Sequence, residues 1–390
     1  MAETLTRILT DRRRLQPPSF PDLVRKAAVR ARVGPGRIFR DIVGQALRRN
    51  GMNQYDFFDN HLYRPDLTPA ERREFVGEKA SYKLNLRLSP PGLTRMRGFL
   101  NDKIAFTALW HQFGIPTTTT RTVYSPDRWL GSIPALRTAQ DITAYLTGTA
   151  EFPLFGKPAE GLQGLGSVRI DSVDTGAGTA QLGDGRVVTI EDLVDDIVRC
   201  FPQGYLFQDV VEQHEQISAL AGTAVSCVRF VTVMDDTHPR ILYTSWKIAS
   251  PAAMADNFWQ EGSMLARVAP ESGIVENCVT GRGPEAQEVT EHPVSGMPII
   301  GFRIPHWTAA ADMVRNAHAM FPINGCLGWD VAIGPDGPLM IECNDNPGHE
   351  FYQMVNGRGI LNPDIKPILD AVEARNRRII EEKKVRKYKV

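Results

Sequence analysis

The pattern of apolar and polar positions changes character near residue 90. Residues 1 to about 88 are rich in charge and follow a helical period, with few runs that resemble strands. The sequence Ser-Pro-Pro-Gly at 89–92 interrupts that pattern and marks an expected domain boundary. Beyond it, helical and strand-like segments follow one another. The pattern therefore predicts a mixed α/β (α+β) protein that begins with a mainly helical region.

The segments after this boundary have a clear helical or strand period. Helices are expected at 101–113, 190–200, 308–321 and 364–381. Strands are expected at 121–124, 152–157, 168–170, 205–211, 226–234, 241–248, 327–333 and 338–343. The last two strands are separated by Gly-Pro-Asp-Gly at 334–337, which predicts a tight hairpin turn.

Composition and charge exclude several classes of protein. The 390 residues carry 45 basic and 45 acidic side chains, so the net charge gives no sign of a nucleic-acid partner. The five cysteines are scattered and never spaced as Cys-x-x-Cys, which argues against a disulfide framework or a zinc site. The sequence has neither a signal-peptide pattern nor an apolar run long enough to span a membrane, so we expect a cytoplasmic protein.

The strongest chemical signal lies in the last two expected strands. Asp330 falls within LGWDVAI, and Glu342 and Asn344 lie two apart within MIECN. Residues i and i+2 of a strand point to the same face, and the hairpin turn can bring Asp330 beside the pair. Three oxygen ligands without sulfur or imidazole suit Mg²⁺. A solvated hairpin is the alternative, but the second strand is otherwise apolar, and a carboxylate there needs a metal or a charged partner.

A glycine-rich loop is the second signal. Lys157 ends an expected strand, and Gly161, Gly164 and Gly166 follow within residues 160–167. Closely spaced glycines let backbone amides approach phosphate oxygens, and the lysine adds a positive charge. The loop opens into another strand and lacks Gly-Lys-Ser/Thr, so it is neither a dinucleotide fingerprint nor a P-loop. Taken alone, the loop is compatible with a plain hairpin. Lys103 lies at the start of an expected helix and, taken alone, is compatible with an ordinary solvated lysine.

Taken in order, these features resemble the ATP-grasp superfamily. The series comprises Lys103, Lys157 with its glycine loop, the β-rich segment 205–215, Arg229, and finally Asp330, Glu342 and Asn344. The chain is most similar to the sugar-transfer-associated ATP-grasp branch. The motifs behind that narrower resemblance are NDKIAF at 101–106, VSCVRFVTV at 225–233, DNFWQEGSM at 256–264 and GWDVAIGPDGPLMIECNDNPG at 328–348. It covers roughly residues 95–372.

The resemblance implies a fold of two α+β subdomains that clasp ATP. It divides the chain into a helical region at 1–94, a small subdomain with a lid at 95–204, a large subdomain with the magnesium site at 205–372, and a basic tail at 373–390.

The resemblance also implies a role for each site residue. The ATP-binding set is Lys103 and Lys157 at the phosphates, the lid glycines Gly161, Gly164 and Gly166, then Gln208, Asp209 and Val211 at the adenine, and Glu215 at the ribose. The family usually has a glutamate where this chain has Gln208. Arg229, Lys247 and Asn257 match positions near the γ-phosphate, and Asp330, Glu342 and Asn344 match the Mg²⁺ ligands. Arg229 and Lys247 are also compatible with ordinary strand positions.

The implied activity is ligation of a carboxylate to an amine. Transfer of the γ-phosphoryl of ATP gives an acyl phosphate, which an amine attacks, and ADP and phosphate are released. The expected partners are small carboxylates and amines, sugar- or peptide-linked ones included, and a homodimer is an open alternative. Two alternative functions stay open. The protein could transfer the phosphoryl group to a hydroxyl, or it could be a non-enzymatic ATP-binding partner of a glycosyltransferase. Candidate carboxylate-binding residues, in or near the loop-rich segment 276–306, are Arg267, Arg282, His292, Arg303 and His306.

Overall fold

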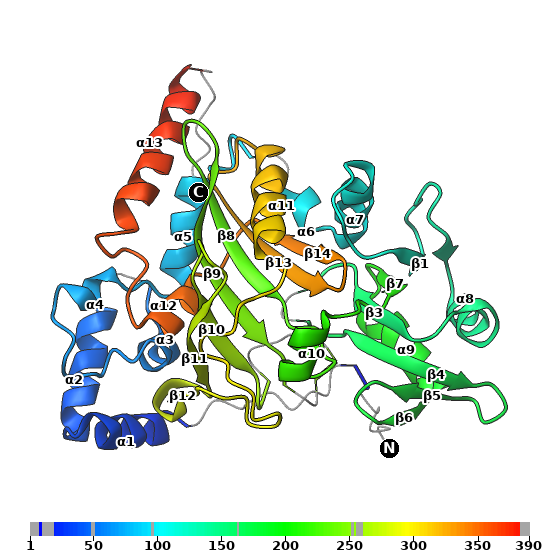
Figure 1. The fold of residues 1–390 in the computed structure, drawn as a ribbon, viewed down its shortest axis with the longest axis horizontal. Helices are drawn as coiled ribbons and strands as arrows, with labels where there is room; N and C mark the ends of the chain where they lie inside the picture. The colour runs from blue at the N-terminus through cyan, green and yellow to red at the C-terminus, as the bar shows by residue number, and fades with distance from the viewer. Residues whose placement is uncertain are drawn as a thin grey trace.

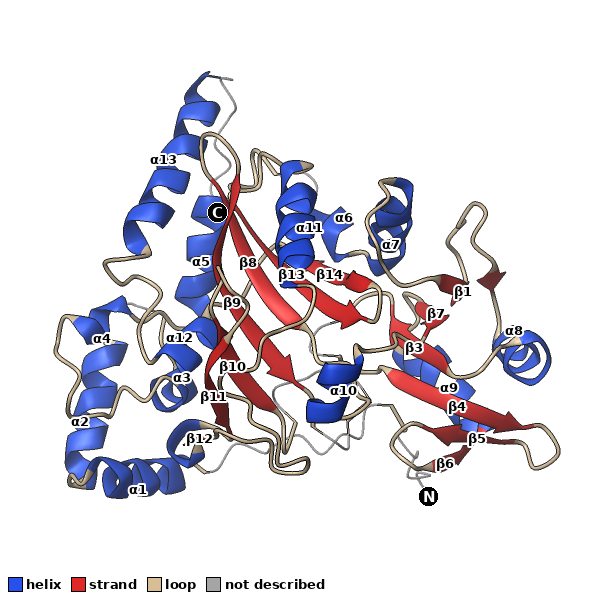
Figure 2. Ribbon diagram, viewed as in Figure 1, coloured by secondary structure: helices blue, strands red, loops and turns tan. Residues whose placement is uncertain are grey.

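Two seven-stranded sheets dominate the part of the chain that the computed structural model describes: residues 8–9, 19–47, 51–94, 97–161, 164–250, 253–254 and 260–382. We call them the N-terminal sheet (β1 to β7) and the C-terminal sheet (β8 to β14). They lie side by side, and the N-terminal helices pack beyond the C-terminal sheet (Figure 1). Helices surround both sheets (Figure 2). This arrangement confirms the predicted α+β class.

The N-terminal region is helical, as predicted. Its helices are α1 (Phe20–Ala31), α2 (Pro35–Ala46), α3 (Gln54–Asp59), α4 (Glu71–Glu74) and α5 (Glu78–Leu88). Phe57, Phe58 and Tyr63 form a core with residues of α1 and α2. In contrast, α5 packs its Leu84 and Leu88 against the C-terminal sheet. The last helix of this region is therefore part of the layer that covers that sheet.

The N-terminal sheet has the strand order β2-β1-β7-β3-β4-β5-β6. Its strands are β1 (Thr120–Tyr124), β2 (Ala135–Leu136), β3 (Leu154–Pro158), β4 (Val168–Asp174), β5 (Thr179–Leu182), β6 (Val187–Thr189) and β7 (Tyr205–Asp209). Among the described strands of this sheet, β1 and β2 pair in parallel and the other neighbours are antiparallel. One face packs on α8 (Ala139–Ala144), a π-helical turn (Tyr145–Thr149) and α9 (Ile190–Cys200), and the other carries Leu206 towards Ile104.

The C-terminal sheet has the strand order β12-β11-β10-β9-β8-β13-β14. Its strands are β8 (Val228–Met234), β9 (Pro239–Ile248), β10 (Met264–Val268), β11 (Val275–Thr280), β12 (Gln287–Glu288), β13 (Cys326–Gly334) and β14 (Gly337–Asn344), with a short 3₁₀ turn at Gly283–Glu285. All its neighbouring strands are antiparallel.

Helices cover both faces of the C-terminal sheet. One face buries Phe230, Trp246 and Trp329 against α7 (Lys103–Gln112), α10 (Glu215–Ala221) and α11 (Trp307–Ala319). The opposite face packs Val231, Val233 and Tyr243 against α5, α12 (Glu350–Asn356) and α13 (Lys366–Glu382). A short helix, α6 (Arg97–Asn101), leads into α7. The second face is covered only along part of its length, and the functional site occupies the remainder.

Most predicted elements are confirmed, with shifts at their ends. Helix 190–200 is α9, and the hairpin at 327–343 is β13 and β14 with its turn at Gly334–Gly337. The helix expected at 101–113 begins only at Lys103, because the Asp102 side chain caps it by accepting from the backbone N–H of Ile104. The last helix continues to Glu382, past the boundary expected at residue 372, and the remainder of the tail, 383–390, lies outside the described residues. Within those residues no helix combines the length and apolar character needed to cross a bilayer.

Candidate functional site

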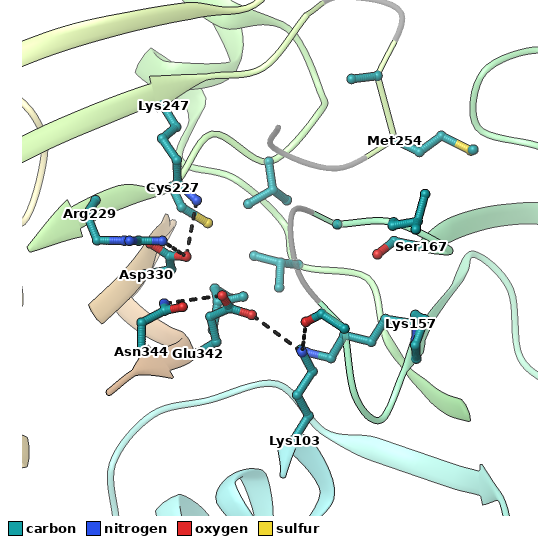
Figure 3. A pocket seen from close by; sticks show the side chains of 18 of the residues that line it. Lys103, Lys157, Ser167, Cys227, Arg229, Lys247, Met254, Asp330, Glu342 and Asn344 are labelled. Carbon is teal, nitrogen blue, oxygen red and sulfur yellow. Dashed lines mark hydrogen bonds and ion pairs between the residues drawn. The ribbon is translucent and has the colours of Figure 1, made fainter. Parts of the chain in front are cut away.

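A cavity of about 670 Å³ lies between the two sheets. The lining includes the ends of β3 and β7 with the glycine loop, the start of α7, residues 223–225, the charged face of the C-terminal sheet, and helix α5 with the residues that follow β14. Figure 3 shows the charged side chains converging on this space from both sheets. The series predicted from the sequence is therefore largely gathered into one site.

Strand register gathers the charges of the C-terminal sheet. Asp330 on β13 is in register with Arg229 on β8 and with Glu342 on β14. Residues in register across antiparallel strands point to the same face. Lys247 joins them because it lies two residues beyond Ser245, which is in register with Arg229. Trp329, which directly precedes Asp330 on β13, points to the opposite face of the sheet, into the core.

A β-bulge in β14 brings one more residue to the cavity. Asp330 pairs with Glu342, but the next residue, Val331, pairs with Met340, so Ile341 has no partner on β13. A bulge re-aims the side chains around it. Here Ile341 and Glu342 both line the cavity, whereas Met340 belongs to the core. The alternation expected for a regular strand would have turned Ile341 away from the site.

Asp330 is the buried centre of an ion-pair network. Arg229 donates from Nε to Oδ1 at 2.5 Å and from Nη2 to Oδ2 at 2.9 Å, and Lys247 Nζ donates to Oδ2 at 3.1 Å. Burial opposes the charge on Asp330, but attraction to the two cations outweighs it and holds the pKa of this carboxyl well below its usual range. Burial likewise disfavours the guanidinium, yet the attraction of Asp330 raises the pKa of Arg229. Asp330 and Arg229 are therefore both charged at neutral pH.

Glu342 and Asn344 lie beside this network with freer oxygens. Asn344 Nδ2 donates to Glu342 Oε1 at 3.3 Å, which leaves the amide oxygen of Asn344 directed elsewhere. Glu342 Oε2 lies 3.8 Å from Lys103 Nζ, and that ammonium donates to the carbonyl oxygen of Gly161 at 2.9 Å. Lys103 thus connects the acidic hairpin to the base of the glycine loop (Figure 3).

The donor set fits a hard cation such as Mg²⁺. A carboxylate offers about four lone-pair directions, so the three donors from Arg229 and Lys247 leave about one on Asp330. Glu342 and the amide oxygen of Asn344 supply the others, all of them oxygen. The set contains two carboxylates and one amide, and no cluster of three His, Cys, Asp or Glu side chains occurs in the described ranges.

The N-terminal sheet contributes the opposite wall. Phe155 is in register with Gln208, and Lys157 with Leu206, so Phe155, Lys157 and Gln208 share one face and line the cavity. Asp209 and Val211 also line it. Gln208 donates from Nε2 to Thr120 Oγ1 at 2.9 Å, while its Oε1 is buried and has no partner in the part of the chain that the structure describes. A buried acceptor without a donor is costly and fits a ligand N–H.

Some expected site residues lie elsewhere. Gly161 and Gly164 line the cavity, but Gly166 does not: it has φ +80°, and a Cβ there would lie 2.2 Å from Cζ of Phe201, so packing accounts for this glycine. Glu215 begins α10 as an exposed residue and does not line the cavity. Asn257 lies outside the described residues.

The predicted carboxylate-binding residues do not line the cavity, so that prediction is wrong for Arg267, Arg282, His292, Arg303 and His306. Segment 276–306 runs through β11 and β12, at the edge of the C-terminal sheet opposite β13 and β14. Two of the five residues are paired elsewhere: Arg267, on β10, with Glu276 at 2.7 Å, and Arg282 with Asp59 at 2.6 Å. Strand order, which the sequence does not reveal, separates this segment from the site.

The sequence also left several lining residues unassigned. Arg169 on β4 lines the cavity, as do Glu350 and Phe351 at the start of α12. The larger omission is helix α5, from which Glu78, Lys79, Ser81, Tyr82 and Lys83 reach the cavity. Its sequence is that of an ordinary amphipathic helix, and only the tertiary packing assigns it to the site.

A pair of α+β units around a cavity that carries a lysine on each wall, a glycine loop and an acidic hairpin defines the ATP-grasp class of protein. A family model described as sugar-transfer associated ATP-grasp matches residues 93–368. The chain belongs to this family. The match begins after α5, so that helix precedes the part that defines the family.

Comparison with solved structures gives distant similarities. The D-alanine-D-alanine ligase from Coxiella burnetii is 12% identical, with a TM-score of 0.39, over 73% of this chain and 61% of the ligase. A biotin carboxylase complex from Campylobacter jejuni is 12% identical, with a TM-score of 0.39, over 71% of this chain and 46% of that chain. The chain thus spans less than two thirds of the length of these proteins. No curated protein matches the sequence.

Proposed function

We propose that this protein is an ATP-dependent ligase that joins a carboxylate to an amine through an acyl phosphate and releases ADP and phosphate. One observation carries the proposal: a single cavity holds Lys103, Lys157, Arg229 and Lys247 together with the oxygen donors of the acidic hairpin, and it extends beyond them towards α5. Phosphoryl transfer needs positioning and charge stabilisation more than it needs acid–base groups. The predicted subdomain boundaries, the homodimer and the cytoplasmic location stay predictions.

The cations of the site divide the phosphate chain between them. Lys103 and Lys157 come from the wall that carries the glycine loop, and we assign them the α- and β-phosphates. Arg229 and Lys247 come from the opposite wall, where Asp330 fixes both of them, and we assign them the γ-phosphoryl group. Cations held in place before the reaction stabilise developing charge without reorganisation.

Glu342, Asn344 and the remaining lone pair of Asp330 would hold Mg²⁺. Bound there, the ion neutralises phosphate charge and draws electron density from the transferred group. At the other end of the cavity, the buried Oε1 of Gln208 would accept from the adenine amino group. These assignments leave the α5 side of the cavity for the other substrates.

Glu350 is the candidate that receives the proton of the attacking amine. It lines the cavity, and burial raises the pKa of its carboxyl, with a smaller opposing effect from Arg229 and smaller additions from Asp56 and Glu78. A carboxylate with a raised pKa is a stronger proton acceptor near neutral pH. A base at this position supports attack by an amine.

A coupled ADP-release screen tests the proposal. Pairs of one carboxylate and one amine, including sugar-linked and peptide acids, are incubated with the protein, ATP and Mg²⁺, and products are identified by mass spectrometry. We expect ADP release that requires both substrates and a product with the mass of an amide. A phosphorylated product formed without any amine would instead identify a phosphotransferase and overturn the ligase assignment.

A further inference from the structure

The cavity extends past the phosphate-binding cations to a wall formed by α5. Glu78, Lys79, Ser81, Tyr82 and Lys83 line it from this helix. Across from them, Asn346, Gly348, Glu350 and Phe351 line it from the segment that follows the acidic hairpin. None of the roles assigned to ATP or Mg²⁺ uses these α5 side chains. The wall is therefore available to the substrate that receives the activated group.

Hydrogen bonds fix α5 to the segment beyond Asn344. Asn85 Nδ2 donates to Asn346 Oδ1 at 2.8 Å and to the carbonyl of Pro347 at 2.9 Å. The His349 ring lies between Asn85 Oδ1, at 3.1 Å from Nε2, and the Tyr243 hydroxyl, at 2.9 Å from Nδ1. All these groups except Asn346 are buried. The helix is thus held rigidly to the strand that carries the predicted metal ligands.

Lys79 and Lys83 are the two lysines of α5 that line this wall. Lys79 and Lys83 are four residues apart, so they lie on the same face of the helix about one turn from each other. Neither makes a hydrogen bond or ion pair with any residue the structure describes. On the same helix Arg87, outside the cavity, pairs with Glu373 at 3.2 Å. Like charges at this spacing repel, and a bound anion relieves that repulsion.

The other charges of the wall restrict where an anion can bind. Glu78 and Glu350 both line the cavity and repel an anionic group, whereas they favour an ammonium. Tyr82, 48% exposed, lies in the sequence between the two lysines and adds apolar surface to the wall. The wall therefore has a cationic part at Lys79 and Lys83 and an acidic part at Glu78 and Glu350.

We infer that Lys79 and Lys83 bind an anionic oxygen group, a phosphate or a carboxylate, of the substrate that reacts with the activated carboxylate. The acidic part of the wall then faces the amine of the same molecule. The role of the bound molecule as a substrate rests on the proposed ligase function, whereas the anion binding itself does not. The N-terminal helical region consequently supplies substrate selection to the ATP-grasp unit.

The test measures binding rather than turnover, so it does not depend on the ligase proposal. Full-length protein saturated with ADP and Mg²⁺ is titrated calorimetrically with glucose 1-phosphate as the phosphate probe, glutarate as the carboxylate probe and methyl glucoside as the uncharged probe. We expect at least one anionic probe to bind and methyl glucoside not to bind. The double substitution Lys79→Gln, Lys83→Gln should weaken that binding about 10- to 100-fold.

Controls separate recognition from folding. Lys79→Arg with Lys83→Arg keeps the charge and should retain binding within about threefold, and Arg87→Gln, on the same helix outside the cavity, should leave it unchanged. The affinity for ADP should be the same in every variant. If neither anion binds the wild type, or if the double glutamine variant binds as the wild type does, the inference is overturned. Anion binding without any ligation in the ADP-release screen would retain the inference and reject only the proposed function.

Discussion

The cavity contains two groups of cations that differ in burial and pairing. Arg229 and Lys247 are 9% and 7% exposed, and both bond to Asp330. Lys79 and Lys83 are exposed, and no residue in the described ranges pairs with them. The first group is fixed by the sheet before any ligand arrives, and the second is free to adjust. Fixed charge suits a constant ligand such as the phosphate chain of ATP, and adjustable charge suits a variable one.

This difference follows from desolvation. A buried cation must be paired, since burial of an isolated charge costs roughly several kcal/mol of folding free energy. An exposed lysine has no such requirement and contributes little to folding. Substitutions in the buried network of Arg229, Lys247 and Asp330 should therefore affect both chemistry and stability, whereas substitutions of Lys79 and Lys83 should affect only ligand affinity. The predictions below test that division, beginning with the largest expected effect.

Replacing Glu342 with glutamine should abolish ATP turnover. The substitution keeps the shape of the side chain but removes the charge expected to hold Mg²⁺, so we expect a loss of about 10⁴-fold or more in kcat and a weakened Mg²⁺ dependence. Glu342 is only half-buried, so the melting temperature should change little. Glu276→Gln, on the exposed pair with Arg267, is the matched control and should retain full turnover. Turnover that survives in Glu342→Gln with unchanged Mg²⁺ dependence would contradict the site assignment.

Replacing Arg229 with methionine should destabilise the fold by about 3–5 kcal/mol, because it leaves Asp330 buried with only one cation. Urea unfolding measures this change. The same substitution at Arg267, whose pair with Glu276 is exposed, should cost at most about 1 kcal/mol. Removing the whole network, with Asp330→Leu and Lys247→Met added, should restore much of the stability while turnover stays absent. If Arg229→Met and Arg267→Met cost the same, burial does not distinguish the two kinds of pair.

The sequence indicates the residues of the C-terminal sheet that line the cavity, but it does not indicate those of α5. The acidic hairpin could be predicted because two short-range rules apply to it, strand parity and a tight turn, whereas Lys103 and Lys157 were assigned to the site through the resemblance. The pairing of Asp330 with Arg229, 101 residues away, follows from strand register, which the sequence does not reveal, and the resemblance placed Arg229 only near the γ-phosphate. The part played by α5 depends on contacts between residues 81–85 and 346–349, which no periodicity reveals.

The same reason explains what was wrong. Arg282 was considered because it is a cation in the loop-rich segment 276–306, but strand order places that segment at the far edge of the sheet. The β-bulge at Ile341 was also missed, since one extra residue does not disturb an apolar run enough to be recognised. Local patterns therefore identify chemistry, and the global topology decides which chemistries meet.

His349 makes hydrogen bonds to Asn85 of α5 and to Tyr243 of the C-terminal sheet, and acid should weaken this connection. Burial lowers the pKa of this imidazole to about 4, below its ordinary value of 6.5. Because the folded-state pKa is the lower one, the unfolded chain binds the proton more readily, so stability is full above pH 6.5 and falls as the pH drops towards 4. The loss is about 2 kcal/mol at pH 5.

Unfolding by urea at pH 7 and pH 5 measures this contribution. His61, His292 and His318 have pKa values lowered in the same direction, so the wild type contains these contributions as well as that of His349. His349→Gln should be less stable at pH 7 but should lose about 2 kcal/mol less between the two pH values than the wild type does. An equal loss in both proteins would show that His349 does not carry a depressed pKa.

The smallest expected effect concerns Gln208, which is buried like Arg229 but uncharged, and so separates burial from charge. Its Oε1 has no donor within the described residues, and we assign it to the adenine amino group. Gln208→Met should raise the KM for ATP about tenfold with little change in kcat, because one neutral hydrogen bond contributes about 1–1.5 kcal/mol to binding. Gln208→Glu retains an acceptor and should stay nearer the wild type. If Gln208→Met lowers kcat as Glu342→Gln does, burial rather than charge determines which residues support the chemistry.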